Sequence, residues 1–153
     1  MITYLDHDVA FQTSGESQMM PALVSLLRRR KWVRADTLLA REFPINGRRV
    51  DLAVLTRSRI VSAFELKMGG FSRVLEQAVY NRLTFDKSWV VVSGEPRSSN
   101  LSEAERFGVG VIVVSGGQPR VILRPGRPIF DPRARLRVLA RFAEIPTPIG
   151  EHV

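Results

Sequence analysis

The chain has 153 residues, of which 44% are hydrophobic and 25% are charged, so one folded domain is expected and a disordered or collagen-like chain is excluded. It has no cysteine and two histidines, His7 and His152, which excludes disulfides, thiolate zinc sites and cysteine nucleophiles and disfavours a Ser-His-Asp triad. Lysine and arginine total 23 against 15 acids, for a formal net charge of +8. This charge favours a nucleic acid over a membrane as the partner, because bound phosphates release their counterions.

Two further features concern location and the type of cation. No apolar run approaches the roughly 18 residues that span a bilayer, and residues 1–10 lack the pattern of a secretion signal. A cytoplasmic protein with no membrane segment is therefore expected. All but three of the 23 cations are arginine. Arginine suits bidentate binding of phosphate, although a bias in base composition would produce the same ratio.

Hydrophobic periodicity and turn signals predict the element order αβββαβαββα. Residues 13–16 have the spacing of a capping box and start a first helix, unless Pro21, which is tolerated in a first turn, moves the start into 17–20. The pair Asn46-Gly47 predicts a two-residue type I′ hairpin turn. Strands are expected at about 34–45, 48–56, 60–67, 88–92, 109–114 and 120–124, and later helices at 72–85, 102–107 and 131–144.

A hairpin meander followed by helix–strand units indicates an α/β fold with a mixed central sheet and helices on both faces. We interpret residues 1–153 as a single domain that ends in a basic helix at about 131–144. In the helix expected at 72–85, Ser72 is the predicted N-cap. The residues predicted to form its buried face are Leu75, Val79 and Leu83.

Several arginines are candidates for contacts with nucleic acid. On the last helix an arginine stripe recurs at four-residue intervals, formed by Arg133, Arg137 and Arg141. Beside it lies an apolar set, formed by Leu136, Leu139, Ala140 and Ala143. The stripe either follows the phosphates of a bound nucleic acid or is a solvated face. The other arginines expected to bind nucleic acid are Arg48, Arg49 and Arg73.

The two turns of the meander predict which side chains lie next to one another. The first hairpin places Glu42 opposite Asp51, and a three-residue turn at 57–59 places Asp51 opposite Glu65. Directly opposite residues share one face of a sheet, so these three carboxylates are expected together, with Lys67 two residues along from Glu65. A bulge in the second turn would shift the pairing by one residue and place the acids on different faces.

Carboxylates this close on a buried strand repel one another unless a cation joins them or one of them is protonated. Oxygen ligands without thiolate or imidazole suit Mg²⁺ or Mn²⁺. A lysine beside such an ion can orient or deprotonate a water, or stabilise the charge that develops on a phosphoryl group. The pattern therefore favours a site that hydrolyses phosphodiesters.

The sequence has an acid at the end of one strand, Asp51, and an acid-x-Lys pattern on the next strand, Glu65-Leu66-Lys67, with 13 residues between the two acids. This pattern resembles the active-site motif of the PD-(D/E)XK nuclease superfamily. The order αβββαβ over about residues 14–115 is similar to the core of that family. The resemblance implies a restriction-endonuclease-like fold and Mg²⁺-dependent hydrolysis of a phosphodiester by water. It also implies that Asp51, Glu65 and the Leu66 carbonyl hold the metal and that Lys67 activates the attacking water.

Two further residues match features of that family. Glu16, on the first helix, is in the place of an additional acid and is implied as a further metal ligand. Many members carry a Gln and then a Tyr on the helix after the Lys strand, and Gln77 and Tyr80 occur here with two intervening residues rather than three. Gln77 is implied to support Lys67 or a phosphate. One polar stripe of this helix contains Arg73, Gln77, Tyr80, Asn81 and Thr84.

These residues also have explanations that involve no chemistry, in which they are solvated, ion-paired or helix-capping side chains. For Glu65 and Lys67 the alternative is a solvated strand edge, and for Gln77 it is an ordinary surface position. For Asp51 it is an ion pair with Arg48 or Arg49, and for Glu42 an ion pair with Arg41 or Arg49. For Glu16 it is a capping-box role.

We therefore predict a metal-dependent deoxyribonuclease that selects DNA structure rather than sequence, as enzymes of DNA repair, recombination or defence do. Its size and basic charge are similar to those of stand-alone members of the Holliday-junction-resolvase kind, which implies a homodimer. The alternative is a DNA-binding module or subunit on the same fold without catalytic activity. An RNA target has no support, because the sequence carries no aromatic RNA-binding signature.

Overall fold

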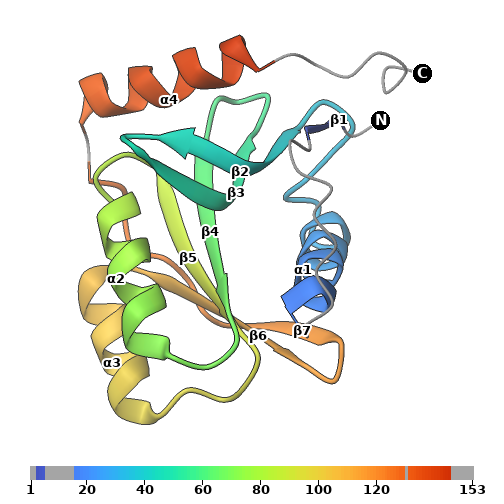
Figure 1. Ribbon diagram of the computed structural model, residues 1–153, viewed down its shortest axis with the longest axis vertical. Coiled ribbons are helices and arrows are strands. Elements are labelled where there is room, and N and C mark those ends of the chain that lie inside the picture. Colours follow the sequence, from blue (N-terminus) through green and yellow to red (C-terminus); the bar gives the residue numbers. More distant parts are fainter. Residues whose placement is uncertain (1–2, 6–15, 130, 146–153) are drawn as a thin grey trace.

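The chain folds around one central sheet with helices on both of its faces (Figure 1). The computed structural model describes residues 3–5, 16–129 and 131–145, with side chains from residue 18 onward. Within these residues the sheet has seven strands in the order β1-β2-β3-β4-β5-β6-β7, which confirms the predicted mixed α/β fold. The strands are β1 (Thr3–Leu5), β2 (Leu38–Ile45), β3 (Arg48–Leu55), β4 (Val61–Lys67), β5 (Lys87–Val92), β6 (Gly110–Ser115) and β7 (Gln118–Leu123). The helices are α1 (Glu16–Arg29), α2 (Phe71–Asn81), α3 (Ser98–Phe107) and α4 (Pro132–Glu144).

The strand directions explain why some strands are joined by tight turns and others by helices. β1 runs parallel to β2, and β2, β3 and β4 form an antiparallel meander. β4, β5 and β6 are parallel, so the chain must cross over between them, and it does so through α2 and α3. β7 returns antiparallel to β6 at the far edge. The segment from α1 to β5 has the predicted αβββαβ order.

Apolar side chains form layers on both faces of the sheet. On one face α1 contributes Leu23, which belongs to the same cluster as Leu52 and Phe64 of the sheet. On the other face α4 covers the β2–β3 hairpin, while α2 and α3 cover β5 and β6 (Figure 1). Val90 and Val91 are neighbours in β5 but belong to different layers, as expected for alternating side chains in a buried strand. None of the described helices is long and apolar enough to cross a membrane.

Several element boundaries differ from the predicted ones. α1 begins at Glu16, as the predicted capping box indicates, so the alternative start within 17–20 is wrong and Pro21 lies inside the helix. α2 has Gly70 rather than Ser72 at its N-cap, and it ends at Asn81 rather than near residue 85. α3 starts four residues before its predicted start, at Ser98. β1 has no counterpart among the predicted elements.

The buried face of α2 also differs from the predicted one, and in α4 only part of the apolar residues is buried. α2 ends before Leu83, which is 53% exposed, and its buried residues are Val74, Leu75, Ala78 and Asn81. Leu136 of α4 is 64% exposed, and the buried residues of this helix are Ala134, Val138 and Phe142. Sequence periodicity identifies an apolar stripe, but the way a helix docks decides which stripe is covered.

The Asn46-Gly47 turn has the predicted geometry. Both residues have a positive φ, +53° for Asn46 and +73° for Gly47, as a type I′ turn requires. Asn46 Nδ2 also donates a hydrogen bond of 3.1 Å to Oγ1 of Thr84, which follows α2. The turn therefore sets the register of β2 and β3 and ties the hairpin tip to the segment between α2 and β5.

We predict that Asn46→Ala lowers the free energy of unfolding by about 1 to 2 kcal/mol, because alanine tolerates a left-handed backbone poorly and loses the bond to Thr84. Asn46→Gly should cost less, since glycine adopts a positive φ without strain and loses only the hydrogen bond. Urea denaturation of both variants measures the difference. Equal losses for the two variants would contradict a contribution from the backbone conformation.

Candidate active site

The turns of the meander bring the predicted acids to the same end of neighbouring strands. The β2–β3 pairs on either side of Glu42 and Asp51 have the predicted register. Glu42 itself has a left-handed backbone, with φ of +51°, which interrupts the ladder at this point. The turn between β3 and β4 closes with a 3.0 Å hydrogen bond from Thr56 N–H to the Ile60 carbonyl, which leaves three turn residues as predicted.

Backbone pairing between β3 and β4 ends at Leu52 and Phe64. Beyond this pair, side-chain carboxylates replace carbonyl groups as acceptors. Asp51 Oδ2 accepts a hydrogen bond of 2.8 Å from Leu66 N–H, and Glu65 Oε1 accepts one of 3.4 Å from Asp51 N–H. The predicted adjacency of Asp51 and Glu65 is therefore confirmed.

Glu65 is a buried acid, with only 2% of its surface exposed, so a solvated strand edge is wrong for this residue. Its Oε2 accepts a hydrogen bond of 2.8 Å from Asn81 Nδ2 and lies 3.9 Å from Arg48 Nη2. Burial and then the negative charge of Asp51 raise the pKa of Glu65 from 4.5 to about 7, against the opposing effect of its hydrogen bonds and of the Arg48 charge. The site therefore holds a carboxyl group whose charged form is disfavoured without a further cation.

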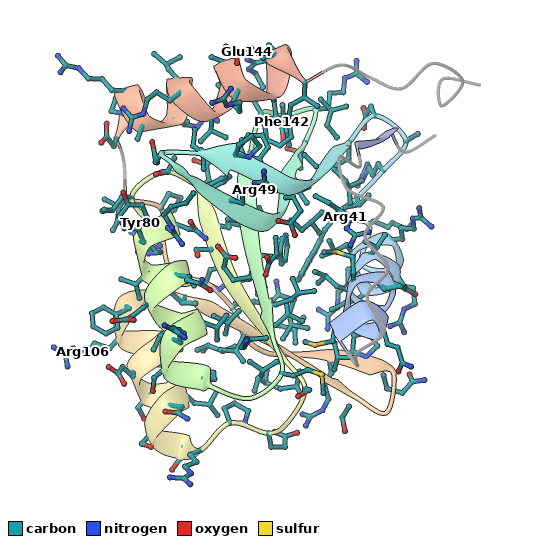
Figure 2. The ribbon with its side chains drawn as sticks, viewed as in Figure 1. Arg41, Arg49, Tyr80, Arg106, Phe142 and Glu144 are labelled. Atoms are coloured by element: carbon teal, nitrogen blue, oxygen red, sulfur yellow. The ribbon has the colours of Figure 1, made fainter. Side chains whose placement is uncertain are left out.

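Asp51 and Glu65 line a polar cavity of about 290 Å³ between α1, α2 and the meander. Its walls are formed by Met20, Arg41, Glu42, Arg49, Asp51, Glu65, Leu66, Lys67 and Gln77. In Figure 2, Arg41 lies toward α1 and Arg49 lies on the β2–β3 hairpin. Lys67 is exposed at the end of β4, and Gln77 reaches the cavity from α2. The structure thus brings together the four residues predicted to be catalytic, namely Asp51, Glu65, Lys67 and Gln77.

The arginines predicted to contact DNA are spread over several surfaces. Arg49 lines the cavity, whereas Arg73 lines a separate groove between α2 and α3. The arginine stripe of α4 is exposed and does not line the cavity; it consists of Arg133, Arg137 and Arg141. Arg141 forms an ion pair of 2.9 Å with Glu144 on its own helix.

Arg48 and Asn81 both approach Glu65, and sequence reasoning assigned neither of them a role at this residue. The Arg48 guanidinium lies 4.5 Å from the centroid of the Tyr80 ring and also approaches Glu65. Asn81 is 2% exposed and follows Gln77 by one helical turn. The signal that pointed toward it was the polar stripe of α2, because a stripe of this kind places Asn81 on the same side of the helix as Gln77.

The donor chemistry of the site fits a hard divalent cation at Asp51 and Glu65. Both supply carboxylate oxygens, and a cation between them would oppose the two effects that raise the pKa of Glu65, namely burial and then the charge of Asp51. In the described part of the chain, no group of three or more acidic, histidine or cysteine side chains is placed to hold a metal ion, so Glu42 does not complete a three-acid cluster. Glu16 begins α1, but the side chain of this predicted ligand lies outside the described residues.

Comparison with known proteins adds information about the fold. The sequence matches no protein-family profile and no curated protein. Among solved structures, the chain is similar to SPO1766, a protein of unknown function from Silicibacter pomeroyi, with a TM-score of 0.63 and 16% identity over 87% of this chain and 86% of that one. The EndoMS-dsDNA2 complex gives a TM-score of 0.45 and 13% identity over 79% of this chain and 50% of that one. The first likeness shows a shared fold and nothing of function, and the second is too remote to bear on either.

We predict that the free energy of unfolding of the wild type falls, relative to that of Glu65→Gln, by up to about 3 kcal/mol as the pH rises from about 4.5 to about 7. The folded protein binds the Glu65 proton more tightly than the unfolded chain does. The stabilisation that comes from this tighter proton binding is therefore complete below the pKa of Glu65 in the unfolded chain. It is lost as the pH rises toward the pKa of Glu65 in the folded protein. Urea denaturation in a chelator at several pH values measures the difference, because glutamine stays neutral and keeps an acceptor for Asn81. A difference that does not vary with pH would contradict the raised pKa.

Proposed function

We propose that this protein is a Mg²⁺- or Mn²⁺-dependent deoxyribonuclease. The observation that carries the proposal is the pair of Asp51 and Glu65, which meet where the β3–β4 ladder ends and line one polar cavity. Two adjacent carboxylates, one of them buried, require a cation or a proton. A net charge of +8 favours a polyanionic substrate. Hydrolysis of a phosphodiester uses both properties.

The residues of the cavity can be assigned separate tasks. Asp51, Glu65 and the Leu66 carbonyl would hold the ion, and Glu16 is a further candidate ligand. A bound Mg²⁺ supplies a Lewis acid and a metal-activated water near neutral pH. Lys67 would position the attacking water and stabilise the negative charge that develops on the phosphoryl oxygens. Gln77, on the α2 side of the cavity, would hold Lys67 or a phosphate oxygen.

The cations of the cavity support DNA as the substrate. Arg41, Arg49 and Lys67 all line it, and arginine binds phosphate oxygens through two parallel hydrogen bonds. We infer selection by DNA structure rather than sequence, in repair, recombination or defence. Two copies acting as a homodimer would cut both strands of a branched substrate, and the mass of the protein in solution tests this.

Incubating a panel of DNA substrates with Mn²⁺, and separately with Mg²⁺, tests the proposal; the panel contains four-way junctions, flaps, linear duplex and single strands. We expect cleavage by the wild type and by Lys87→Ala, which removes an exposed lysine at the start of β5 outside the cavity. Lys67→Ala should lower the rate by about 10²-fold or more. Asp51→Asn should abolish cleavage, because it removes a charged ligand.

The outcomes separate the proposal from its alternative. DNA that is bound but not cleaved by the wild type, for every substrate and either metal ion, would reject a nuclease and favour a DNA-binding module or subunit on the same fold. Equal products from the wild type and Lys67→Ala would reject the assigned role of Lys67 alone.

A second measurement concerns the arginines that bind DNA. We predict that Arg49→Gln weakens binding to every DNA sequence and reduces the slope of log affinity against log salt by roughly one. Combining Arg133→Gln with Arg137→Gln should reduce it by roughly two if both residues contact phosphates. Fluorescence anisotropy in a chelator measures these slopes without cleavage. A slope unchanged by the double substitution would identify the stripe on α4 as a solvated face.

A further inference from the structure

Asn81 is a buried polar residue whose amide is engaged within the candidate site. Its Nδ2 donates a hydrogen bond of 2.8 Å to Oε2 of Glu65, and each residue is only 2% exposed. A polar group left without a partner at this depth destabilises the folded protein, and a charged group does so more strongly. The contact therefore restricts the side-chain angles of both residues.

A second element approaches the same oxygen of Glu65. Arg48, at the start of β3, places Nη2 at 3.9 Å from Oε2, while its guanidinium lies over the ring of Tyr80. Tyr80 immediately precedes Asn81, so the last turn of α2 carries both the donor to Glu65 and the ring beneath Arg48. The hairpin and α2 therefore act together on one carboxylate oxygen.

The other oxygen of Glu65 lies on the side of Asp51. Oε1 accepts the 3.4 Å hydrogen bond from Asp51 N–H, whereas Oε2 accepts the shorter bond from Asn81. A half turn of the carboxylate about its last bond only exchanges two equivalent oxygens, whereas any smaller rotation would lengthen or break both contacts. The two oxygens therefore have different partners: Oε1 accepts from the β3 backbone at Asp51, whereas Oε2 accepts from Asn81 of α2 and is approached by Arg48.

We propose that Asn81 is a positioning residue of this site, which holds Oε2 of Glu65 so that Oε1 stays turned toward Asp51 and the two carboxylates can share one divalent cation. The inference rests on the proposed function, because it assigns Asn81 a role only where Asp51 and Glu65 bind an ion. Partners that orient a ligating side chain typically change metal affinity by about 10- to 100-fold.

Calorimetry of the full chain with Mn²⁺, in the absence of DNA, tests this role through Asn81→Leu, which keeps a similar side-chain volume and removes the donor. We expect Mn²⁺ to bind at least about ten-fold more weakly than to the wild type. Asn81→Ser is a second variant, because its smaller side chain leaves room for a water and is less disruptive to packing. In a Glu65→Gln background, Asn81→Leu should cause no further loss.

Thr84→Val is the matched control. It removes the hydrogen bond with Asn46 just beyond the same end of α2, at a residue that is 6% exposed. Urea denaturation in a chelator should show a loss of stability for both Thr84→Val and Asn81→Leu. Only the Asn81 variants should bind Mn²⁺ more weakly, because a loss of packing alone leaves the orientation of Glu65 unchanged.

The failure of the inference can be distinguished from the failure of the proposed function. Equal Mn²⁺ affinities for the wild type and a folded Asn81 variant would overturn the positioning role and leave the proposed function intact. A wild type that binds no Mn²⁺, or binds it as well after Asp51→Ala and Glu65→Ala, would overturn the proposed function and the inference with it.

Discussion

The candidate site depends on an exchange of hydrogen-bond acceptors at the end of the β3–β4 pair, where side-chain carboxylates take the place of backbone carbonyls. Backbone pairing stops at Leu52 and Phe64, and the next two donors bond to side chains: Leu66 N–H to Asp51, and Asp51 N–H to Glu65. A buried N–H without an acceptor is costly, so this exchange holds both carboxylates in place whether or not a ligand is bound. The acids proposed to carry the chemistry are therefore also the acids that complete the hydrogen bonding of the sheet.

This arrangement places a carboxyl group where its charge is disfavoured. Burial and the neighbouring Asp51 raise the pKa of Glu65 to about 7, and only part of the penalty is offset by Asn81 and Arg48. Asn81 belongs to α2 and Arg48 to the β2–β3 hairpin. Glu65 therefore has partners on two elements that are far apart in the sequence, and a cation bound to Glu65 would stabilise the folded state in which these partners are in place.

Local geometry is the reason that the pair of acids was predictable. The Asn46-Gly47 turn requires positive φ at both positions and sets the register of β2 and β3 over a few residues. The turn at 57–59 does the same for β3 and β4, which places Asp51 beside Glu65. Apolar runs with turn signals between them likewise indicated the αβββαβ order. All of these depend on residues close together in the chain, so the rest of the fold hardly affects them.

The sequence by itself therefore determined the αβββαβ order of elements from α1 to β5, the register of the meander and the adjacency of the two acids, whereas the tertiary structure alone decided what surrounds them. Asn81 belongs to a polar stripe, and periodicity does not distinguish a polar residue that will be buried from one that will be solvated. The same limit applies to Leu83 and Leu136, which are apolar but exposed, and to Arg48, which lies against Glu65 and Tyr80. Burial depends on how a helix docks, and docking is set by contacts between segments far apart in the chain.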